Sequence, residues 1–426
     1  MKKLTIIMLL CVVATGIWGQ QAKKEIMHNP YLSASNYLAY PGPQKELTKA
    51  PKGYLPFYIS HYGRHGSRYL IGENEYPRPL QILERADSAG KLSALGRDVL
   101  RRVRMINDEA YKRLGELTEL GAEQHWQIAT RMYDRFPEVF AGDVCVDAKS
   151  TVVIRCILSM ENELQALLLR NPNLHITHDA SEHDMYYMNL HDEKLRAQRH
   201  SKEGDDALKA YQKKHVDNSR VVNSLFNDTA YVNHNVSKNL GHYLFKLASN
   251  LQSTELRKQI TLYDIFTREE LYNNWLGQNA SWYLGYGFNP KNGARQPYSQ
   301  RNLLRKIIEQ ADSCIRLERP GATLRFGHET MVLPLTCLLG LNGYDQQIDD
   351  LEQLEQRGWI NYRVFPMGAN IQFIFYRKHF GDSDILFKVL LNEDEATLPL
   401  KTDCAPYYHW SDFRAHYLKM LDAYKD

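Results

Sequence analysis

Residues 54–68 have the sequence YLPFYISHYGRHGSR. The first seven residues, Tyr54–Ser60, are mostly apolar and predict a short buried strand. From His61 to Arg68 the chain is polar and contains glycine, which predicts a loop after that strand. A strand that runs into a glycine-containing loop is the usual position of an active site in an α/β protein. This stretch therefore predicts an α/β fold with a functional loop at one edge of its sheet.

The loop contains Arg64-His65-Gly66-Ser67-Arg68, in which two guanidinium groups flank one imidazole. Each guanidinium is a planar fork of donors that matches two phosphate oxygens. Gly66 leaves room for an anion close to the backbone. Nearby positive charge keeps a histidine neutral to lower pH, so a ring nitrogen of His65 is free to attack phosphorus. The alternative, a solvated basic turn, is disfavoured because the loop leaves a buried strand.

Further segments predict strands of the same sheet. They are residues 144–147, 174–177 and 321–326, with a late hairpin from 369–378 and 385–392. Between the first two, apolar residues have the three-and-four spacing of a helix with one buried face, at Ile157, Met160, Leu164, Leu167 and Leu168. The order strand, loop, helix, strand favours parallel pairing. We therefore predict a mainly parallel sheet flanked by helices, including surface helices within residues 84–134.

The chain changes character between residues 185 and 311. Strand-like runs are absent there, and Lys, Asn, Tyr and Gln occur in helical patterns such as Leu240–Ala248. A mature chain of about 400 residues also exceeds what one hydrophobic core usually serves. We expect an α/β core formed by residues 28–184 and 312–426, with residues 185–311 inserted as an α-helical cap. The active-site cleft should lie between the core and the cap.

The N-terminus has the three-part layout of a bacterial signal peptide. A basic start, MKK, is followed by an apolar run, Leu4–Ile17, and by polar residues from Gln20 onward. The apolar run is shorter than the roughly 20 residues that span a bilayer. We expect cleavage after Gly19, which makes residues 1–19 a signal peptide. The mature protein should then be periplasmic or secreted, without a membrane partner.

The composition narrows the remaining classes. Lysine and arginine number 53 against 50 aspartate and glutamate, without a long basic run, so no nucleic-acid partner is expected. An odd number of cysteines follows the signal peptide, so at least one lies outside any intrachain disulfide and the pairing stays open. These cysteines are Cys145, Cys156, Cys314, Cys337 and Cys404. No CxxC pair occurs, so zinc-ribbon and thioredoxin-like sites have no support.

The loop after the first strand resembles the first signature of the histidine acid phosphatase family, Arg-His-Gly-x-Arg-x-Pro, with Leu70 at the proline position. The family's second signature is His-Asp, or His-Ala-Glu in the multiple inositol-polyphosphate phosphatases. Residues 324–330 match it: His328 aligns with the second phosphate-binding histidine, and Glu329 takes the aspartate position. Arg155, followed by cysteine at a predicted helix start, fits the family's third phosphate-binding arginine.

The resemblance extends from residue 28 to residue 426. Leu117–Gly121 matches the family's Leu-Thr-x-x-Gly element. Residues 266–271, residues 279–287 and the C-terminal segment resemble the inositol-polyphosphate (phytase) branch and the bacterial histidine-type phosphatases near it.

The resemblance implies a phosphomonoester hydrolase that works without a metal or a cofactor. His65 would be the nucleophile that forms a phosphohistidine, and Glu329 would give a proton to the leaving oxygen. Arg64, Arg68, Arg155 and His328 would bind the phosphate. The implied partner is a small phosphate ester, most of all an inositol polyphosphate such as phytate.

Other interpretations stay open on the sequence. A broad-specificity acid phosphatase would act on sugar phosphates with the same residues. A periplasmic binding protein for phosphate esters would need the anion pocket without a nucleophile, and the paired His65 and His328 argue against it. Glu329 has a structural alternative, as a carboxylate that stabilises the start of a helix. Zinc-protease patterns fail, because Tyr62 and Val332 stand where such sites need glutamate and histidine, so no metal site is predicted.

Overall fold

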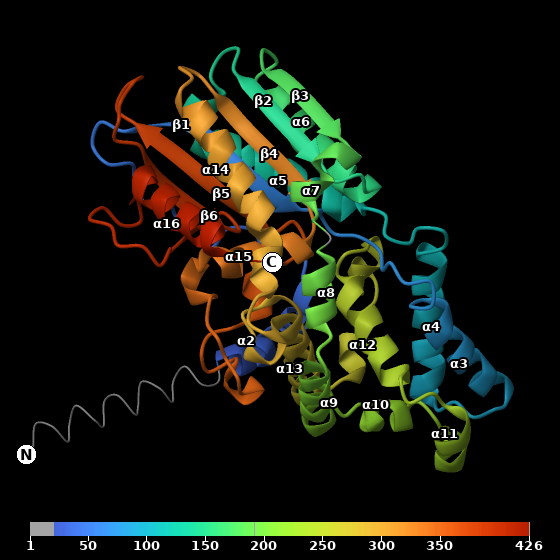
Figure 1. Cartoon of the computed structure of the whole chain (residues 1–426). Coiled ribbons are helices and arrows are strands. Elements are labelled where there is room, and N and C mark those ends of the chain that lie inside the picture. Colours follow the sequence, from blue (N-terminus) through green and yellow to red (C-terminus); the bar gives the residue numbers. More distant parts are fainter. Residues whose placement is uncertain (1–20, 191, 426) are drawn as a thin grey trace, which may run out of the picture.

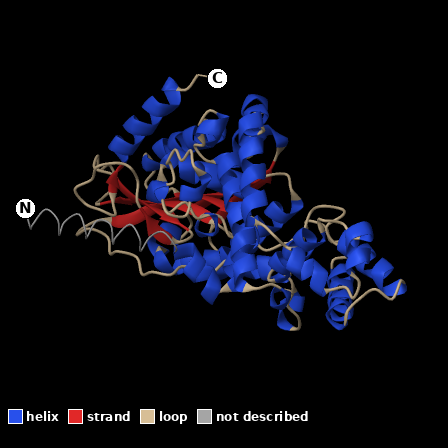
Figure 2. Cartoon of the chain, turned by 90° about the horizontal axis from the view of Figure 1, so that it is seen from below, coloured by secondary structure: helices blue, strands red, loops and turns tan. Residues whose placement is uncertain are grey.

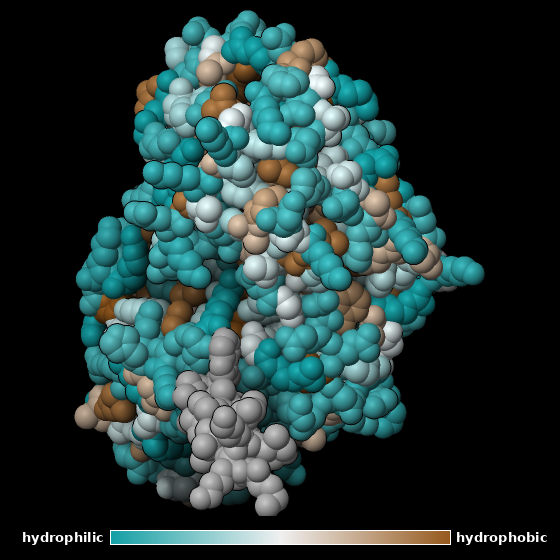
Figure 3. Space-filling model, turned by 90° about the vertical axis from the view of Figure 1, so that its left-hand side faces the viewer, coloured by the Kyte–Doolittle hydropathy of each residue, from teal (hydrophilic) through white to brown (hydrophobic). Residues whose placement is uncertain are grey.

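The computed structural model of the chain describes residues 21–190 and 192–425. The predicted signal peptide, residues 1–19, lies outside the described residues. Within the described ranges, no helix is long and apolar enough to cross a membrane. The face shown in Figure 3 is mainly hydrophilic, with apolar side chains scattered over it. Each of the five described cysteines is a free thiol.

The described residues form one mixed sheet with the order β3-β2-β4-β1-β5-β6-β7, and β8 pairs with β6 (Figure 1). Neighbouring strands are parallel in the half that contains β1 (Leu55–Arg64), β2 (Cys145–Ser150), β3 (His175–Ala180) and β4 (Gly321–Gly327). They are antiparallel in the half that adds β5 (Asn370–Arg377), β6 (Leu386–Leu391), β7 (Asp394–Ala396) and β8 (Tyr408–His409). The predicted α/β class and the late hairpin are confirmed.

β1 lies at the centre of the sheet, between β4 and β5. Every residue from Tyr58 to Arg64 is buried, because helices cover both faces of the strand. The strand runs to Arg64, beyond the predicted end at Ser60, since Arg64 still pairs with Gly327 of β4. His65 is therefore the first residue after the strand, and the predicted loop from His61 to Arg64 is wrong.

Two layers of helices enclose the sheet (Figure 2). One layer contains α5 (Glu119–Arg135) and α6 (Ile154–Arg170), and the other contains α14 (Arg301–Ile315), α15 (Glu329–Leu339) and α16 (Trp410–Ala423). Successive residues of a strand point to opposite faces, so neighbouring residues of β1 join different cores. Tyr58 packs in the cluster that includes Phe413 of α16, and Ile59 packs in the cluster that includes Met160 of α6.

A helical part lies beyond one end of the sheet (Figure 1). Its helices within residues 185–311 are α8 (Glu193–Arg199), α9 (Lys202–His215), α10 (Ser219–Ser224), α11 (Thr229–Asn235), α12 (Leu240–Leu251) and α13 (Arg268–Tyr286), whereas α7 (Met185–Met188) contacts β4 and α14 at the sheet. Helices α3 (Pro77–Ser88) and α4 (Ala94–Glu109) pack together, and α3 contacts α12, although both precede the predicted insertion. One continuous apolar cluster joins Leu244 and Trp275 of this part to Phe413 on the sheet. The division into a core and an inserted cap stays a prediction.

The N-terminal segment lies against the helical part. It consists of α2 (Gln21–His28) and a 3₁₀ segment, Pro30–Tyr37. The 3₁₀ segment contacts α12 and α13, and it also contacts the short turn Asn361–Arg363 that precedes β5. Residues far apart in sequence therefore meet beside the end of β1.

Substitution of a glycine in α5 tests how closely this helix packs on the loop after β1, and a glycine in α13 provides the comparison. A Cβ atom on Gly121 of α5 would lie 2.2 Å from the carbonyl oxygen of Ser67, whereas a Cβ on Gly285 of α13 would have its nearest neighbour at 3.8 Å. We predict that Gly121→Ala lowers the free energy of unfolding by about 1–3 kcal/mol, because backbone must shift. Gly285→Ala should raise it by up to about 1 kcal/mol, since alanine favours helix. Urea unfolding measures both values, and equal stability of the two variants would contradict the close contact.

Candidate active site

Parallel strands bring the predicted site residues to one edge of the sheet. β1 ends at Arg64 and is followed by His65, while β4 ends at Gly327 and is followed by His328. β2 lies next to β4 and leads into α6, which carries Arg155 in its first turn. All six residues predicted for the site are thus gathered there, namely Arg64, His65, Arg68, Arg155, His328 and Glu329.

His65 is fully buried, and its two ring nitrogens have different surroundings. Nδ1 lies 2.9 Å from the carbonyl oxygen of Gly66, which can only accept, so Nδ1 carries the proton and Nε2 carries the lone pair. Nε2 has no hydrogen-bond partner among the described residues. Burial, helped by the charges of Arg64 and Arg155 and opposed by Glu329, holds the pKa of His65 well below its usual value. The ring is therefore a neutral imidazole with a free nucleophilic nitrogen.

The arginines of the site are anchored on one side and unsatisfied on the other. Nη1 of Arg64 donates to the carbonyl oxygens of Asn36 and Phe365, both at 2.7 Å. Arg68 donates from Nη1 to the Tyr69 carbonyl oxygen at 2.9 Å. Nε of Arg64 faces Glu329 at 3.1 Å. Apart from it, the buried donors of these arginines without a hydrogen-bond partner in the described part of the chain are Nη2 of Arg64, Nε of Arg68 and Nε of Arg155.

The burial of neighbouring guanidinium groups disfavours their charged form. Burial, with the charges of Arg68 and Arg155, lowers the pKa of Arg64 to about 10. Buried donors are nearly always satisfied in folded proteins, so three unsatisfied donors at one place indicate a site for an anion. Planar, charged donors of this kind favour phosphate.

His328 lies beside His65, with ring centroids 5.8 Å apart and nearly perpendicular planes. Its Nε2 is 3.3 Å from Oγ1 of Thr151 at the end of β2. Burial and then the charges of the nearby arginines lower the pKa of His328 to about 4, although Glu329 opposes the shift. His328 is therefore also neutral above that pH, and it can take part in a hydrogen bond to a bound anion.

Glu329 is the first residue of α15 and faces the same point. Its Oε2 lies 3.1 Å from Nε of Arg64 and 3.6 Å from Nε2 of His65, and its Oε1 lies 3.9 Å from Nη2 of Arg68. Burial opposes its charge, but the charges of Arg64 and then Arg68 hold the pKa of Glu329 well below the usual value. Glu329 is an ionised carboxylate in this arrangement, so the predicted role as proton donor requires that it first gain a proton.

From the sequence we did not identify the residues that hold the loop after β1, residues 65–68, called the catalytic loop below. Oε1 of Gln124 accepts from the amide of Ser67 at 2.9 Å, and Oγ of Ser159 accepts from the amide of Gly66 at 3.1 Å. Gln124 follows the Leu-Thr-x-x-Gly element by three residues on α5, which is the one sequence signal for it. Nδ2 of Asn36 lies 3.5 Å from Oε1 of Glu329, and nothing in the N-terminal sequence indicates this contact.

Ligand atoms for a metal exist at the site but are surrounded by positive charge. One ligand atom from each of His65, His328 and Glu329 lies within 4.8 Å of the others. Three guanidinium groups adjoin them, which favours an anion over a cation. The absence of a metal from the reaction stays a prediction. A second group with similar spacing, Asp403, Cys404 and His409, is located around β8.

A pocket of about 250 Å³ adjoins the site on the side of the helical part. It is lined by Thr330 and Met331, which directly follow Glu329, and by Arg196, Arg199 and Tyr286, among others. Nη1 of Arg199 donates to the Tyr286 hydroxyl at 2.8 Å, while its buried Nε lacks a partner among the described residues. Burial raises the pKa of Tyr286, Arg199 opposes this shift and the charge of Glu329 adds to it, so the pocket and Glu329 share one electrostatic environment.

Solved structures of several phosphatases resemble the fold. The multiple inositol polyphosphate phosphatase of Bifidobacterium longum, in complex with inositol hexasulfate, gives a TM-score of 0.72 at 17% identity, over 90% of this chain and 97% of its own. The phytase of D. castellii gives 0.67 at 14% identity, over 92% and 85%. The apo phytase of Hafnia alvei gives 0.53 at 14% identity, over 87% and 98%. At these identities the likeness establishes the fold.

Sequence comparison gives the family. No curated protein matches the chain. The family model described as histidine phosphatase superfamily (branch 2) matches residues 63–392, which is 330 of the 426 residues. The match includes the three segments that form the site, the loop after β1, the start of α6 and the start of α15. The chain therefore belongs to branch 2 of the histidine phosphatase superfamily and is, by class, a phosphatase.

Proposed function

We propose that the protein removes phosphate from inositol polyphosphates through a phosphohistidine formed on His65. One observation carries the proposal. A neutral imidazole, whose Nε2 has no hydrogen-bond partner among the described residues and lies 3.6 Å from Glu329, is beside the unsatisfied donors of Arg64, Arg68 and Arg155. A nucleophile and an anion site at one place are what phosphoryl transfer to a side chain requires.

The reaction has two steps. In the first, Nε2 of His65 attacks phosphorus in line with the ester oxygen, so the N–P bond forms as the P–O bond to the alcohol breaks. The three arginines and His328 face the equatorial oxygens and spread the charge of the transition state, a task that metal ions perform in many phosphoryl-transfer enzymes. In the second step water attacks phosphorus, the N–P bond breaks and phosphate leaves.

Glu329 supplies and then recovers the proton in this scheme. A phosphate group that binds Arg64 competes with the carboxylate, and its negative charge raises the pKa of Glu329. Binding therefore takes up a proton at Glu329, which the acid form gives to the leaving alkoxide. In the second step the carboxylate accepts a proton from the attacking water.

The pocket beside Glu329 supports a substrate with several phosphates. Arg196 and Arg199 line it, and a ligand whose reacting phosphate lies at His65 would place further anionic groups toward them. The similar Bifidobacterium longum structure contains inositol hexasulfate, a ring with several anionic groups. A sugar monophosphate, as in a broad-specificity acid phosphatase, would leave these arginines without a charge to bind.

We also propose that the protein is exported and acts in the periplasm or outside the cell. The support is the sequence of residues 1–19. N-terminal sequencing of the protein from the producing cells tests this, and a chain that still begins at Met1 would contradict it.

Phosphate release from phytate and from an aryl monophosphate tests the activity. We predict release from both, a higher kcat/KM on phytate, and the same rates with and without a strong metal chelator, because arginines supply the positive charge. Loss of activity in chelator that only a divalent metal restores would contradict the mechanism. A higher kcat/KM on the aryl ester would favour the broad-specificity alternative.

His65→Ala is the matched control for the covalent step. It should release no phosphate and carry no acid-labile phosphate after a single turnover, yet still bind inorganic phosphate, because the arginines remain. Labelling that persists in His65→Ala would assign the nucleophile to another residue.

Glu329→Gln tests the proton donor. The variant keeps shape and hydrogen bonding but has no proton to give, so phosphorylation by an inositol phosphate should slow by about 10²- to 10⁴-fold. An aryl phosphate leaves as a stabilised phenolate and should lose much less. Single-turnover rates on the two substrates measure the contrast, and equal losses would mean that Glu329 only shapes the site.

The same variant gives a pH test. Glu329 is ionised in the free site, so an anion that displaces it from Arg64 takes up a proton, and inhibition by sulfate should weaken as pH rises. In Glu329→Gln no such proton is taken up, and inhibition should vary less with pH. An equal pH dependence in both proteins would contradict proton uptake at Glu329.

A further inference from the structure

The turn between β6 and β7 has an unusual backbone. Leu391 pairs with Asp394, so Asn392 and Glu393 form a two-residue hairpin turn, and both have positive φ, 55° and 69°. Glycine or asparagine usually occupies such positions, because other side chains are strained there. Glu393 is also only 1% exposed. A strained, buried carboxylate persists when the surrounding structure holds it, which points to a role for its side chain.

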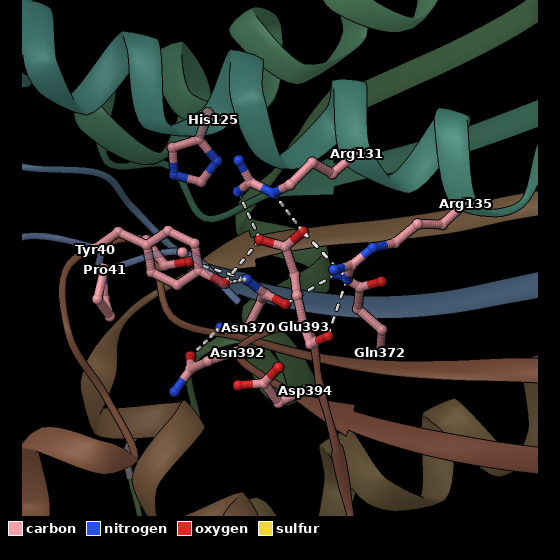
Figure 4. Close-up of polar contacts among 12 residues, drawn as sticks. Tyr40, Pro41, His125, Arg131, Arg135, Asn370, Gln372, Asn392, Glu393 and Asp394 are labelled. Atoms are coloured by element: carbon pink, nitrogen blue, oxygen red, sulfur yellow. Dashed lines mark hydrogen bonds and ion pairs between the residues drawn. The ribbon is translucent and has the colours of Figure 1, made fainter. Parts of the chain in front are cut away.

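The carboxylate of Glu393 is held by α5 and by Tyr40, which follows the N-terminal segment (Figure 4). Arg131 donates to it twice, from Nε at 2.9 Å and from Nη2 at 2.7 Å, and the Tyr40 hydroxyl donates at 2.8 Å. Arg135, one turn further along α5, donates to the backbone carbonyl of Glu393 at 3.0 Å. Burial and Glu393 raise the pKa of Tyr40 well above its usual value, so its hydroxyl stays protonated and donates.

The cluster around Glu393 is connected by hydrogen bonds, through Asn370 and Gly368, to the backbone of His65. Asn370 donates from Nδ2 to the hydroxyl of Tyr40 at 3.3 Å and to the carbonyl of Gly368 at 3.2 Å. The amide of Gly368 in turn donates to the carbonyl of His65 at 2.9 Å. Asn392 reinforces this connection, because its side-chain oxygen accepts from the amide of Asn370 at 3.1 Å.

The cluster around Glu393 is also connected, through helix α5, to the loop after β1. The helix that carries Arg131 also carries Gln124, which holds the amide of Ser67, and Gly121, which packs against Gly66. The loop after β1 therefore rests on two supports, residues 368–370 and helix α5. Glu393 is bonded to α5 through Arg131 and to the first support through Tyr40.

We propose that Glu393 is a positioning residue, which fixes the two supports relative to each other and so aims the imidazole of His65 at phosphorus. This proposal rests on the proposed function of His65 as nucleophile. In-line attack tolerates little displacement, and an error of about 1 Å can cost about 10² in rate. Attraction between an anion and several guanidinium groups is less directional. Loss of Glu393 should therefore slow phosphorylation more than it weakens anion binding.

Glu393→Gln tests the proposal, because it keeps the shape of the side chain and removes the charge that Arg131 requires. We expect single-turnover phosphorylation of His65 by an aryl phosphate to slow by about 10- to 100-fold. The inhibition constant of inorganic phosphate should change by less than about threefold. Rates are measured well below the unfolding temperature of each variant, so that only folded protein contributes.

Asp264→Asn is a control for loss of an ion pair elsewhere in the chain. Asp264 pairs with Arg102 at 2.7 Å, where the side chain of Arg102 is 6% exposed and that of Asp264 is 51% exposed. Arg102 also pairs with Asp98. The pair of Arg102 and Asp264 lies between α4 and the turn before α13, away from the catalytic loop. Asp264→Asn should lower the unfolding temperature without slowing phosphorylation.

A second variant covers the case in which Glu393→Gln does not fold. Glu393→Gly removes the same contacts but relieves the left-handed backbone strain, so it should fold and still phosphorylate slowly. Arg131→Gln should slow phosphorylation to a similar extent, and the double variant with Glu393→Gln should be little worse than either single one, because both break one interaction.

The outcomes distinguish failure of the positioning role of Glu393 from failure of the proposed function of His65. A folded Glu393→Gln or Glu393→Gly protein that phosphorylates at the wild-type rate would overturn the positioning role. The same holds if rate and phosphate affinity fall together, or if Asp264→Asn is equally slow. If the wild-type protein itself forms no acid-labile phosphate, the proposed function fails first.

Discussion

Positive charge that is buried without full compensation is the constraint around which this site is built. Arg64 and Arg68 are buried and Arg155 is half-buried, and burial together with the charge of Arg68 lowers the pKa values of Arg64 and Arg155. A folded chain tolerates such a group only when other atoms hold it. Here main-chain carbonyls hold one edge of Arg64, and Glu329 is the carboxylate that balances the charge. The remaining donors are left for an anion.

The central strand, β1, fixes the positions of Arg64 and His65. β1 is buried on both faces and paired on both edges, so its last residue has no freedom to move. Arg64 and His65 follow directly from that strand, and their backbone is bonded on both sides, by Gly327 of β4 and by Ala369 before β5. Precision at His65 therefore comes from main-chain pairing, while the side chains supply the charge.

The sequence predicts the chemistry better than it predicts the supports. Arg64, His65 and Arg68 lie within five residues, and His328 and Glu329 are adjacent, so a local pattern reveals them. The strand end at Ser60 was wrong because His61 and Arg64 are polar, yet both are buried within β1. Burial of polar residues in a central strand depends on neighbours that no local pattern contains.

The residues that hold the site in place cannot be predicted from the sequence for the same reason. The carbonyl of Asn36 meets Arg64 across 28 residues, and Arg131 meets Glu393 across 262. Each partner alone is an ordinary polar residue, and only the fold makes the pair. Glu329 shows the limit most clearly: its position next to His328 predicts a proton donor, but the arginines around it make it a carboxylate. Since the charge proposed to bind phosphate is the same charge that deprotonates Glu329, the proposed acid chemistry at this residue has to be coupled to the arrival of the substrate's own negative charge.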